Sequence, residues 1–233
     1  MMKKKLVVMA AIVTLVISLG GCAKKVSSQE AADAFINTEV YLKHFDKYET
    51  AFGSQVDAES ESLVKEEIAK DLAAIGIEKG DSAQVVEALI EIMAEKTEIT
   101  ATVLSEEKKQ AVIELTVQGF DMKKFTTNVE KKSQEKLLAL IKAAGIEGVT
   151  SLDDLANLSK QGDYERILEI NEEFQSNSKN LTDVIVAAVN ELEVVEKEQK
   201  VTLTLSENAK NKKYWQVDEE AKTLNALQLL IFD

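Results

Sequence analysis

The chain contains one cysteine, Cys22, and one histidine, His44, and these two residues limit the chemistry it can perform. A single thiol cannot form an intrachain disulfide. One cysteine and one histidine also cannot supply a Cys-based zinc or iron–sulfur site, or a metal site with paired histidines. A lone cysteine can still act as a nucleophile, because its thiolate is readily alkylated. The residues around Cys22 therefore indicate what this thiol is for.

Cys22 follows a segment that has the three parts of a secretory signal. Residues 3–5 are all lysine, residues 6–19 carry no charge, and two glycines come directly before the thiol. A charged start, a short apolar run and small residues at the end are typical of an export signal. The apolar run is shorter than the roughly 20 residues that a transmembrane helix needs. The sequence therefore predicts a cleaved signal peptide over residues 1–21 rather than a permanent membrane-spanning anchor.

The segment Leu19-Gly20-Gly21-Cys22 resembles the lipobox of bacterial lipoprotein precursors. In that family leucine comes first, a small residue third and an invariant cysteine last, while Gly20 stands where Ala, Ser, Thr or Val is usual. The resemblance implies that the Cys22 thiol receives a diacylglyceryl group and that the chain is then cleaved between Gly21 and Cys22. Residues 22–27 would be the lipidated cysteine and a short tether. A buried, inert cysteine is the alternative interpretation of Cys22.

The body that follows is strongly acidic. Removing the three lysines of residues 1–21 changes the formal charge from −13 to −16, and Arg166 is the one arginine in the chain. Nucleic-acid binding needs clustered cations, so this composition argues against nucleic acid as a partner. An anionic lipid surface should also repel a body of this charge. The acyl chains on Cys22 are therefore the expected means of holding it at a membrane.

Several side chains of the body are candidates for a site. Five aromatic residues could line a ligand pocket or form the core instead: Phe35, Tyr41, Phe45, Tyr48 and Trp215. His44 would have to be the base of any nucleophile–His–carboxylate triad, but no Gly-x-Ser-x-Gly motif supplies a partner, and a surface histidine is the alternative. Carboxylates are plentiful, yet none has calcium-loop spacing. We therefore expect no metal, no cofactor and no catalytic residue.

Hydrophobic spacing predicts the elements of the body. Apolar residues at helical spacing predict helices over 28–52, 59–75, 82–96, 121–144 and 151–158, and over 163–192 as one helix or as two with a break near 176–178. Ser28, Asp121 and Asp218 are predicted to cap the first, the fourth and the last helix. Alternating residues predict two β-hairpins, 99–103 with 113–117 and 201–205 with 214–217. A final helix should follow Asp218.

These elements predict an α+β fold, in which several helices pack on a small antiparallel sheet of about four strands in two hairpins. No proline-rich or serine-rich linker divides the chain, so residues 28–233 should form a single extracytoplasmic domain after the N-terminal signal helix. The lipobox, an early aromatic-rich helix and the ending Tyr214-Trp215-Gln216-Val217-Asp218 together resemble lipoproteins of unknown function from Gram-positive bacteria.

The function that we expect is a binding or interaction module, anchored by lipid on the outer side of the cell membrane. Its partners would be the membrane, through the lipid on Cys22, and an unknown protein or small-molecule ligand. An exported hydrolase that uses carboxylates is one alternative, and it predicts two acids that converge with raised pKa values. A passive structural protein of the envelope is the other alternative.

Overall fold

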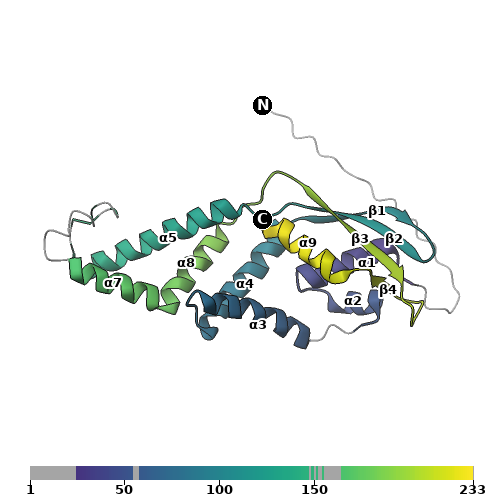
Figure 1. Cartoon of the computed structure of the whole chain (residues 1–233), viewed down its shortest axis with the longest axis horizontal. Helices are drawn as coiled ribbons and strands as arrows, with labels where there is room; N and C mark the ends of the chain where they lie inside the picture. Colours follow the sequence, from purple (N-terminus) through teal and green to yellow (C-terminus); the bar gives the residue numbers. More distant parts are fainter. Residues whose placement is uncertain are drawn as a thin grey trace, which may run out of the picture.

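A computed structural model describes residues 25–54, 58–146, 148, 149, 151, 154 and 164–232 of the chain (Figure 1). Its helices are α1 (Ser28–Phe35), a π-helical turn η1 (Ile36–Val40), α2 (Phe45–Phe52), α3 (Ala58–Ala74), α4 (Lys79–Lys96), α5 (Met122–Ala143), α7 (Tyr164–Ser176), α8 (Ser178–Asn190) and α9 (Glu220–Phe232). Its strands are β1 (Ile99–Glu106), β2 (Gln110–Val117), β3 (Gln199–Glu207) and β4 (Trp215–Val217). The signal peptide, Cys22 and most of the helix predicted over 151–158 lie outside the described residues.

The four strands form one antiparallel sheet in the order β1-β2-β3-β4. The alternation seen in the sequence sets one face of the sheet toward the core, because side chains two apart along a strand share a face. The buried residues of β2, β3 and β4 on this face are Ala111, Ile113, Leu115, Val117, Leu203, Leu205, Trp215 and Val217. The predicted α+β fold with four antiparallel strands is confirmed.

Helices α1, α2 and α9 bury this face of the sheet. Phe35 of α1, Phe52 of α2 and both Leu227 and Ile231 of α9 belong to the same apolar cluster as the strands. Burial of such side chains is worth roughly 1.5–3 kcal/mol each relative to exposure, so this layer supplies the main stabilisation of the body. Among the residues that the structure describes, no helix is both long enough and apolar enough to cross a bilayer.

Helices α5, α7 and α8 form a helical arm that projects from the sheet, with α4 packed against α8 and α3 against α4 (Figure 1). The base of the arm enters the main core through Val189 and Leu192. Farther along the arm, Ile141, Ile146 and Ile167 form a second, smaller apolar cluster. The break predicted near residues 176–178 is confirmed, since α7 ends and α8 begins there.

The single helix predicted over residues 28–52 is wrong, because the chain leaves the helical path after Phe35. The next five residues form the π-helical turn, and Leu42 and His44 then adopt left-handed backbone angles of φ 52° and 57°. Side chains compete here with the helical hydrogen bonds. Asn37 Nδ2 donates to the carbonyl of Asp33 at 2.7 Å, and Thr38 Oγ1 donates to the carbonyl of Lys43 at 3.1 Å.

Two of the three predicted helix caps are also wrong. Ser27, not Ser28, caps α1, and it forms a capping box with Glu30. Asp218 does not cap the last helix, which begins at Glu220; its carboxylate instead accepts a hydrogen bond from Ser206 Oγ at 2.6 Å and so closes β4 onto β3. The cap predicted at Asp121 is confirmed, because its side chain accepts a hydrogen bond from the backbone of the following turn.

Candidate functional site

The first described residues are bound to the end of the sheet by Trp215. The indole Nε1 donates to the carbonyl of Val26 at 2.8 Å, and Nζ of Lys25 lies 3.4 Å from the centroid of the indole ring. Lys25 Nζ also donates to the carbonyl of Lys108, in the turn between β1 and β2, at 3.2 Å. Trp215 is 1% exposed, so these contacts attach Lys25 and Val26 to a rigid part of the core.

This attachment limits the distance between the body and Cys22. Cys22 itself lies outside the described residues, but it precedes Lys25 by three positions. Three residues span at most about 11 Å when fully extended. Chain length therefore keeps the Cα atom of Cys22 within about 11 Å of that of Lys25, which lies against the turn between β1 and β2.

A second cluster joins two carboxylates through a buried tyrosine. Tyr48 of α2 donates its hydroxyl to Oε1 of Glu220, the first residue of α9, at 3.0 Å. Glu39 lies on the π-helical turn and also faces Tyr48. Burial raises the pKa of Glu39 above its ordinary value, and the negative charge of Glu220 adds to this, while the hydrogen bond with Tyr48 opposes it. The pKa of Tyr48 is raised as well, mainly by burial and then by the two carboxylates.

Strained backbone surrounds this carboxylate–tyrosine cluster. Glu39 occupies the π-helical turn, Leu42 follows that turn with a positive φ, and Glu219, directly before Glu220, has φ 51°. A positive φ in a non-glycine residue costs on the order of 1–3 kcal/mol, and such strain gathers at functional sites. Burial and the nearby charge of Glu220 raise the pKa of Glu39, so Glu39 remains protonated to a higher pH than an exposed glutamate does.

Two surface hollows flank the strained residues. One, of about 320 Å³, is lined by Leu42, Lys43, Lys65, Glu87, Ile90 and Glu91. The other, of about 440 Å³, lies where α9 runs beside the part of β3 that extends beyond β4, and it is lined by Val201, Thr202, Thr204, Asp218, Glu219, Lys222, Thr223 and Ala226. Among the described residues, neither lining includes Glu39, Tyr48 or Glu220. The carboxylates are therefore neighbours of the hollows rather than part of them.

The aromatic residues considered as a pocket lining have different environments. Phe35, Tyr48 and Trp215 are buried members of the main apolar core, and Tyr41 is partly buried against it. Phe45 is half-buried, while His44 is exposed and no described nucleophile contacts it. The structure thus brings three of the five together in the core, and their role as a ligand-binding surface stays a prediction.

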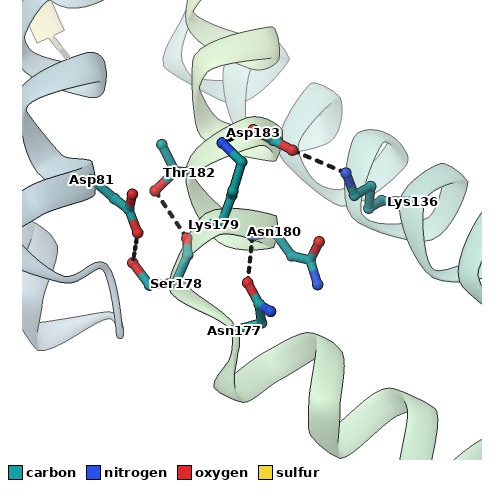
Figure 2. Close-up of polar contacts among 8 residues, drawn as sticks. All are labelled: Asp81, Lys136, Asn177, Ser178, Lys179, Asn180, Thr182 and Asp183. Carbon is teal, nitrogen blue, oxygen red and sulfur yellow. Dashed lines mark hydrogen bonds and ion pairs between the residues drawn. The ribbon is translucent and has the colours of Figure 1, made fainter.

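The junction of α4, α5 and α8 carries a polar network (Figure 2). Ser178 Oγ donates to Asp81 Oδ2 at 2.5 Å and accepts a hydrogen bond from the backbone nitrogen of Glu78 at 2.8 Å. Asp183, one turn further along α8, pairs with Lys136 of α5 at 3.0 Å. Among the described residues, no group of three or more histidine, cysteine or acidic side chains could hold a metal ion. This network connects α8 to α4 and to α5.

Part of the chain matches a known protein family. Residues 20–143 match the family DUF5105, described as a domain of unknown function. The chain belongs to this family. The DUF5105 match extends to the last residue of α5 and includes β1 and β2, whereas β3, β4 and α9 lie beyond it. Half of the sheet therefore comes from outside the segment that defines the family.

The fold is shared with a crystal structure described as "a putative lipoprotein (ycdA) from Bacillus subtilis subsp. subtilis str. 168". The two chains are 16% identical with a TM-score of 0.57, and the likeness covers 88% of this DUF5105 chain. This chain spans 56% of the length of that structure. At this identity the likeness establishes the fold alone. No curated protein matches the sequence.

Sequence reasoning singled out Trp215 and Cys22, whose proposed roles stay predictions, but missed the contacts between the carboxylates and Tyr48. Glu39 and Glu220 are far apart in the sequence, and no local spacing relates them. The single available signal was the Asn37-Thr38 pair, because side chains of these types inside an aromatic-rich helix favour a break. The contact between Lys25 and Trp215 likewise joins residues that are far apart in the sequence, so no local spacing predicts it.

Proposed function

We propose that this chain is a lipoprotein anchored through Cys22 to the outer face of a membrane, and that its body is a binding or interaction module. The observation that carries the anchor is the attachment of Lys25 and Val26 to Trp215, which holds the chain against the sheet three residues after the thiol. Further support comes from the lipobox resemblance of residues 19–22 and from a family match that begins at residue 20.

The proposed modification uses the thiolate of Cys22 as a nucleophile. The sulfur forms a thioether with the diacylglyceryl group of a phospholipid donor, the headgroup phosphate leaves, and the thiol proton passes to the leaving group or solvent. Hydrolysis of the bond between Gly21 and Cys22 then releases the signal peptide. Two acyl chains, at about 0.8 kcal/mol per buried methylene, hold a protein durably where one chain does not.

Replacement of Cys22 by serine tests the anchor. The C22S protein should incorporate no labelled fatty acid and should keep its first 21 residues, as read by mass spectrometry of membrane fractions. The matched control is S18A, a change to a hydroxyl residue four positions earlier, which should be labelled and cleaved as the wild type is. An unmodified Cys22 thiol in wild-type protein from membranes would contradict the proposal.

The binding role is supported by the two hollows beside strained backbone at Leu42 and Glu219. A ligand-stabilisation screen and a pulldown from solubilised membranes test it, with K43E and K222E as variants that reverse one charge in each hollow. A ligand or partner that is lost in one of these variants would assign the hollow. If both methods return nothing with wild-type protein, the binding role is wrong.

The carboxylate–tyrosine cluster favours a second candidate function, an exported hydrolase. Glu39 and Glu220 converge on Tyr48, and the raised pKa of Glu39 suits a general acid. A panel of ester, amide and glycoside substrates tests this function, comparing E39Q with E95Q, which removes an exposed carboxylate elsewhere on the body. Turnover by the wild type that E39Q loses and E95Q keeps would favour the hydrolase over the binding module.

A further inference from the structure

Lysines gather at the end of the sheet nearest Cys22, although the body as a whole is acidic. The turn between β1 and β2 holds Lys108 and Lys109, and all residues of this turn are exposed. The turn between β3 and β4 adds three exposed lysines, and Lys25 lies against the first turn. The six residues, called the lysine face below, are Lys25, Lys108, Lys109, Lys210, Lys212 and Lys213.

The two turns form one surface because the strands hold them together. Glu207 at the end of β3 donates its backbone N–H to the carbonyl of Lys109 at 2.7 Å, and Gln110 pairs with Ser206 across the two strands. Figure 1 shows both turns at one end of the long axis of the molecule, with the helical arm at the other end. The lysine face and the arm therefore point in opposite directions.

The positive charge of the lysine face is not neutralised inside the molecule. None of the six lysines forms an ion pair with another residue that the structure describes. Three carboxylates lie on the adjoining strand ends and turn, Glu106, Glu107 and Glu207, and Glu106 is occupied by a hydrogen bond from Ser28 Oγ at 2.6 Å. Two further carboxylates lie near this end, since Glu30 is bonded to Ser27 and Asp218 to Ser206. The six lysines therefore outnumber the five carboxylates, although the body as a whole is strongly acidic.

We propose that the lysine face binds the anionic phospholipid headgroups of the membrane in which Cys22 is anchored, and so sets the orientation of the body. The inference rests on the proposed function, because the acyl chains bring this end to the bilayer: Cys22 lies within about 11 Å of Lys25. The headgroup phosphates then meet the lysine ammonium groups, while the acidic remainder and the helical arm point away. The overall charge of −16 repels the bilayer weakly by comparison, since salt screens charges beyond about 8 Å at physiological ionic strength.

The expected strength follows from the number of lysines at the surface. Each lysine close to an anionic bilayer strengthens binding by about fivefold. Removing three lysines from one turn should therefore weaken the contact by on the order of one hundredfold, if all three reach the headgroups. The acyl chains still hold the protein on the vesicle in that case, so the readout has to be orientation and not retention.

Trp215 provides this readout, because it is the one tryptophan of the chain and it lies beside Lys25. The full lipidated protein is reconstituted into phosphatidylcholine vesicles with or without phosphatidylglycerol, each carrying a dansyl-labelled lipid. Energy transfer from Trp215 to the dansyl groups reports how close the lysine face lies to the surface. We expect transfer to rise with phosphatidylglycerol and to fall again when salt is added.

Two triple variants make the test specific. K210Q/K212Q/K213Q should lose most of the increase caused by phosphatidylglycerol. The matched control, K123Q/K142Q/K197Q, removes three exposed lysines that lie away from the lysine face and should respond as the wild type does. Equal melting temperatures of the three proteins exclude a folding defect. Adding inorganic phosphate, compared with chloride at the same ionic strength, tells a site for free phosphate from an interaction with the bilayer surface.

The inference is wrong if a protein shown by mass spectrometry to be lipidated gives equal transfer on both kinds of vesicle. It is also wrong if K210Q/K212Q/K213Q responds as the wild type does, or if inorganic phosphate abolishes the response where chloride does not. An unmodified Cys22 would instead contradict the proposed function. The two failures are therefore distinguished by the mass of the N-terminus and by the transfer to dansyl.

Discussion

Gly119, two residues after the end of β2, is the position where adding one methyl group should disturb the fold most. A Cβ atom there would overlap the carbonyl oxygen of Leu230 and lie 3.0 Å from the carbonyl oxygen of Ile231, both in the last turns of α9. The neighbouring backbone is fixed by hydrogen bonds as well. Phe120 N donates to the carbonyl of Ile231 at 2.7 Å, and Val195 N donates to the carbonyl of Gly119 at 2.9 Å.

The magnitude for Gly119→Ala follows from these contacts. Inserting a methyl group into a packed site costs about 1–3 kcal/mol, and here the obstructing atoms are backbone that can move only by weakening two hydrogen bonds of about 1 kcal/mol each. We therefore expect a loss of about 3 kcal/mol. For a domain of this length that corresponds to a Tm lower by roughly 6–12 °C.

The control is Gly80→Ala in α4, where an added Cβ meets nothing within 4 Å. Alanine is favoured over glycine in a helix by up to about 1 kcal/mol, so this variant should melt at the wild-type temperature or slightly above it. Thermal unfolding followed by far-ultraviolet circular dichroism compares the three proteins. If Gly119→Ala melts together with Gly80→Ala, the close approach of β2 and α9 is refuted.

Three further changes have expected outcomes. Replacing Trp215 by phenylalanine should lower the free energy of unfolding by about 1–2 kcal/mol, because the hydrogen bond to Val26 and part of the contact with Lys25 are lost, and an unchanged Tm would contradict the attachment. Replacing Asn177 by alanine removes the side-chain cap of α8 and should cost about 1 kcal/mol in urea unfolding, where no change would mean that the cap is not formed. The pKa of Glu39 is raised in the folded state above its ordinary value of 4.5. Ionisation of Glu39 therefore lowers the free energy of unfolding as the pH rises from 4.5 through the pKa of the folded state. E39Q should thus be more stable than the wild type at neutral pH and equally stable below about pH 4, and an E39Q protein less stable at neutral pH would overturn this reasoning.

Local patterns predicted most elements of the body. The alternation of Ile99, Ala101 and Val103 with threonines identified β1, because a half-buried strand has a period of two. The helix predicted over 121–144 with its cap at Asp121 matches α5, and the predicted helix end at residue 52 matches the end of α2, which Gly53 follows with φ 69°. These features depend on neighbouring residues alone, which a single sequence contains.

The errors arose where distant or competing contacts decide the structure. Asn37 and Thr38 break the helix after Phe35 through side-chain hydrogen bonds that compete with the regular ones. Asp218 does not cap α9, because its carboxylate accepts a hydrogen bond from Ser206 on the neighbouring strand β3. Neither outcome has a signature in the local spacing, because each depends on which groups the fold brings within reach.

The same limit applies to the candidate sites. The lipobox resemblance of residues 19–22 rests on a contiguous motif, so the sequence alone suggests it, and the role that it implies for Cys22 stays a prediction. The lysine face could not, because its turns are separated by about one hundred residues and each contains only two or three lysines. A net charge of the whole chain averages over both ends of the molecule and conceals the positive one.

The pairing of β2 with β3 has a consequence for how the chain folds. β2 ends at Val117 and β3 begins at Gln199, so the two central strands can pair only after a long loop closes. The cost of closure grows with the logarithm of loop length. The helical arm shortens this loop, because α5 packs against α8 and Asp121 N donates to the carbonyl of Glu193 at 2.9 Å.

Packing of α5 against α8 thus holds the ends of the two central strands close together. The ion pair between Lys124 of α5 and Glu193 lies at this closing point. Until β3 arrives, an unpaired β2 is an exposed edge that invites aggregation. We therefore expect that weakening the contact between α5 and α8 slows folding and leaves the final register of the strands unchanged.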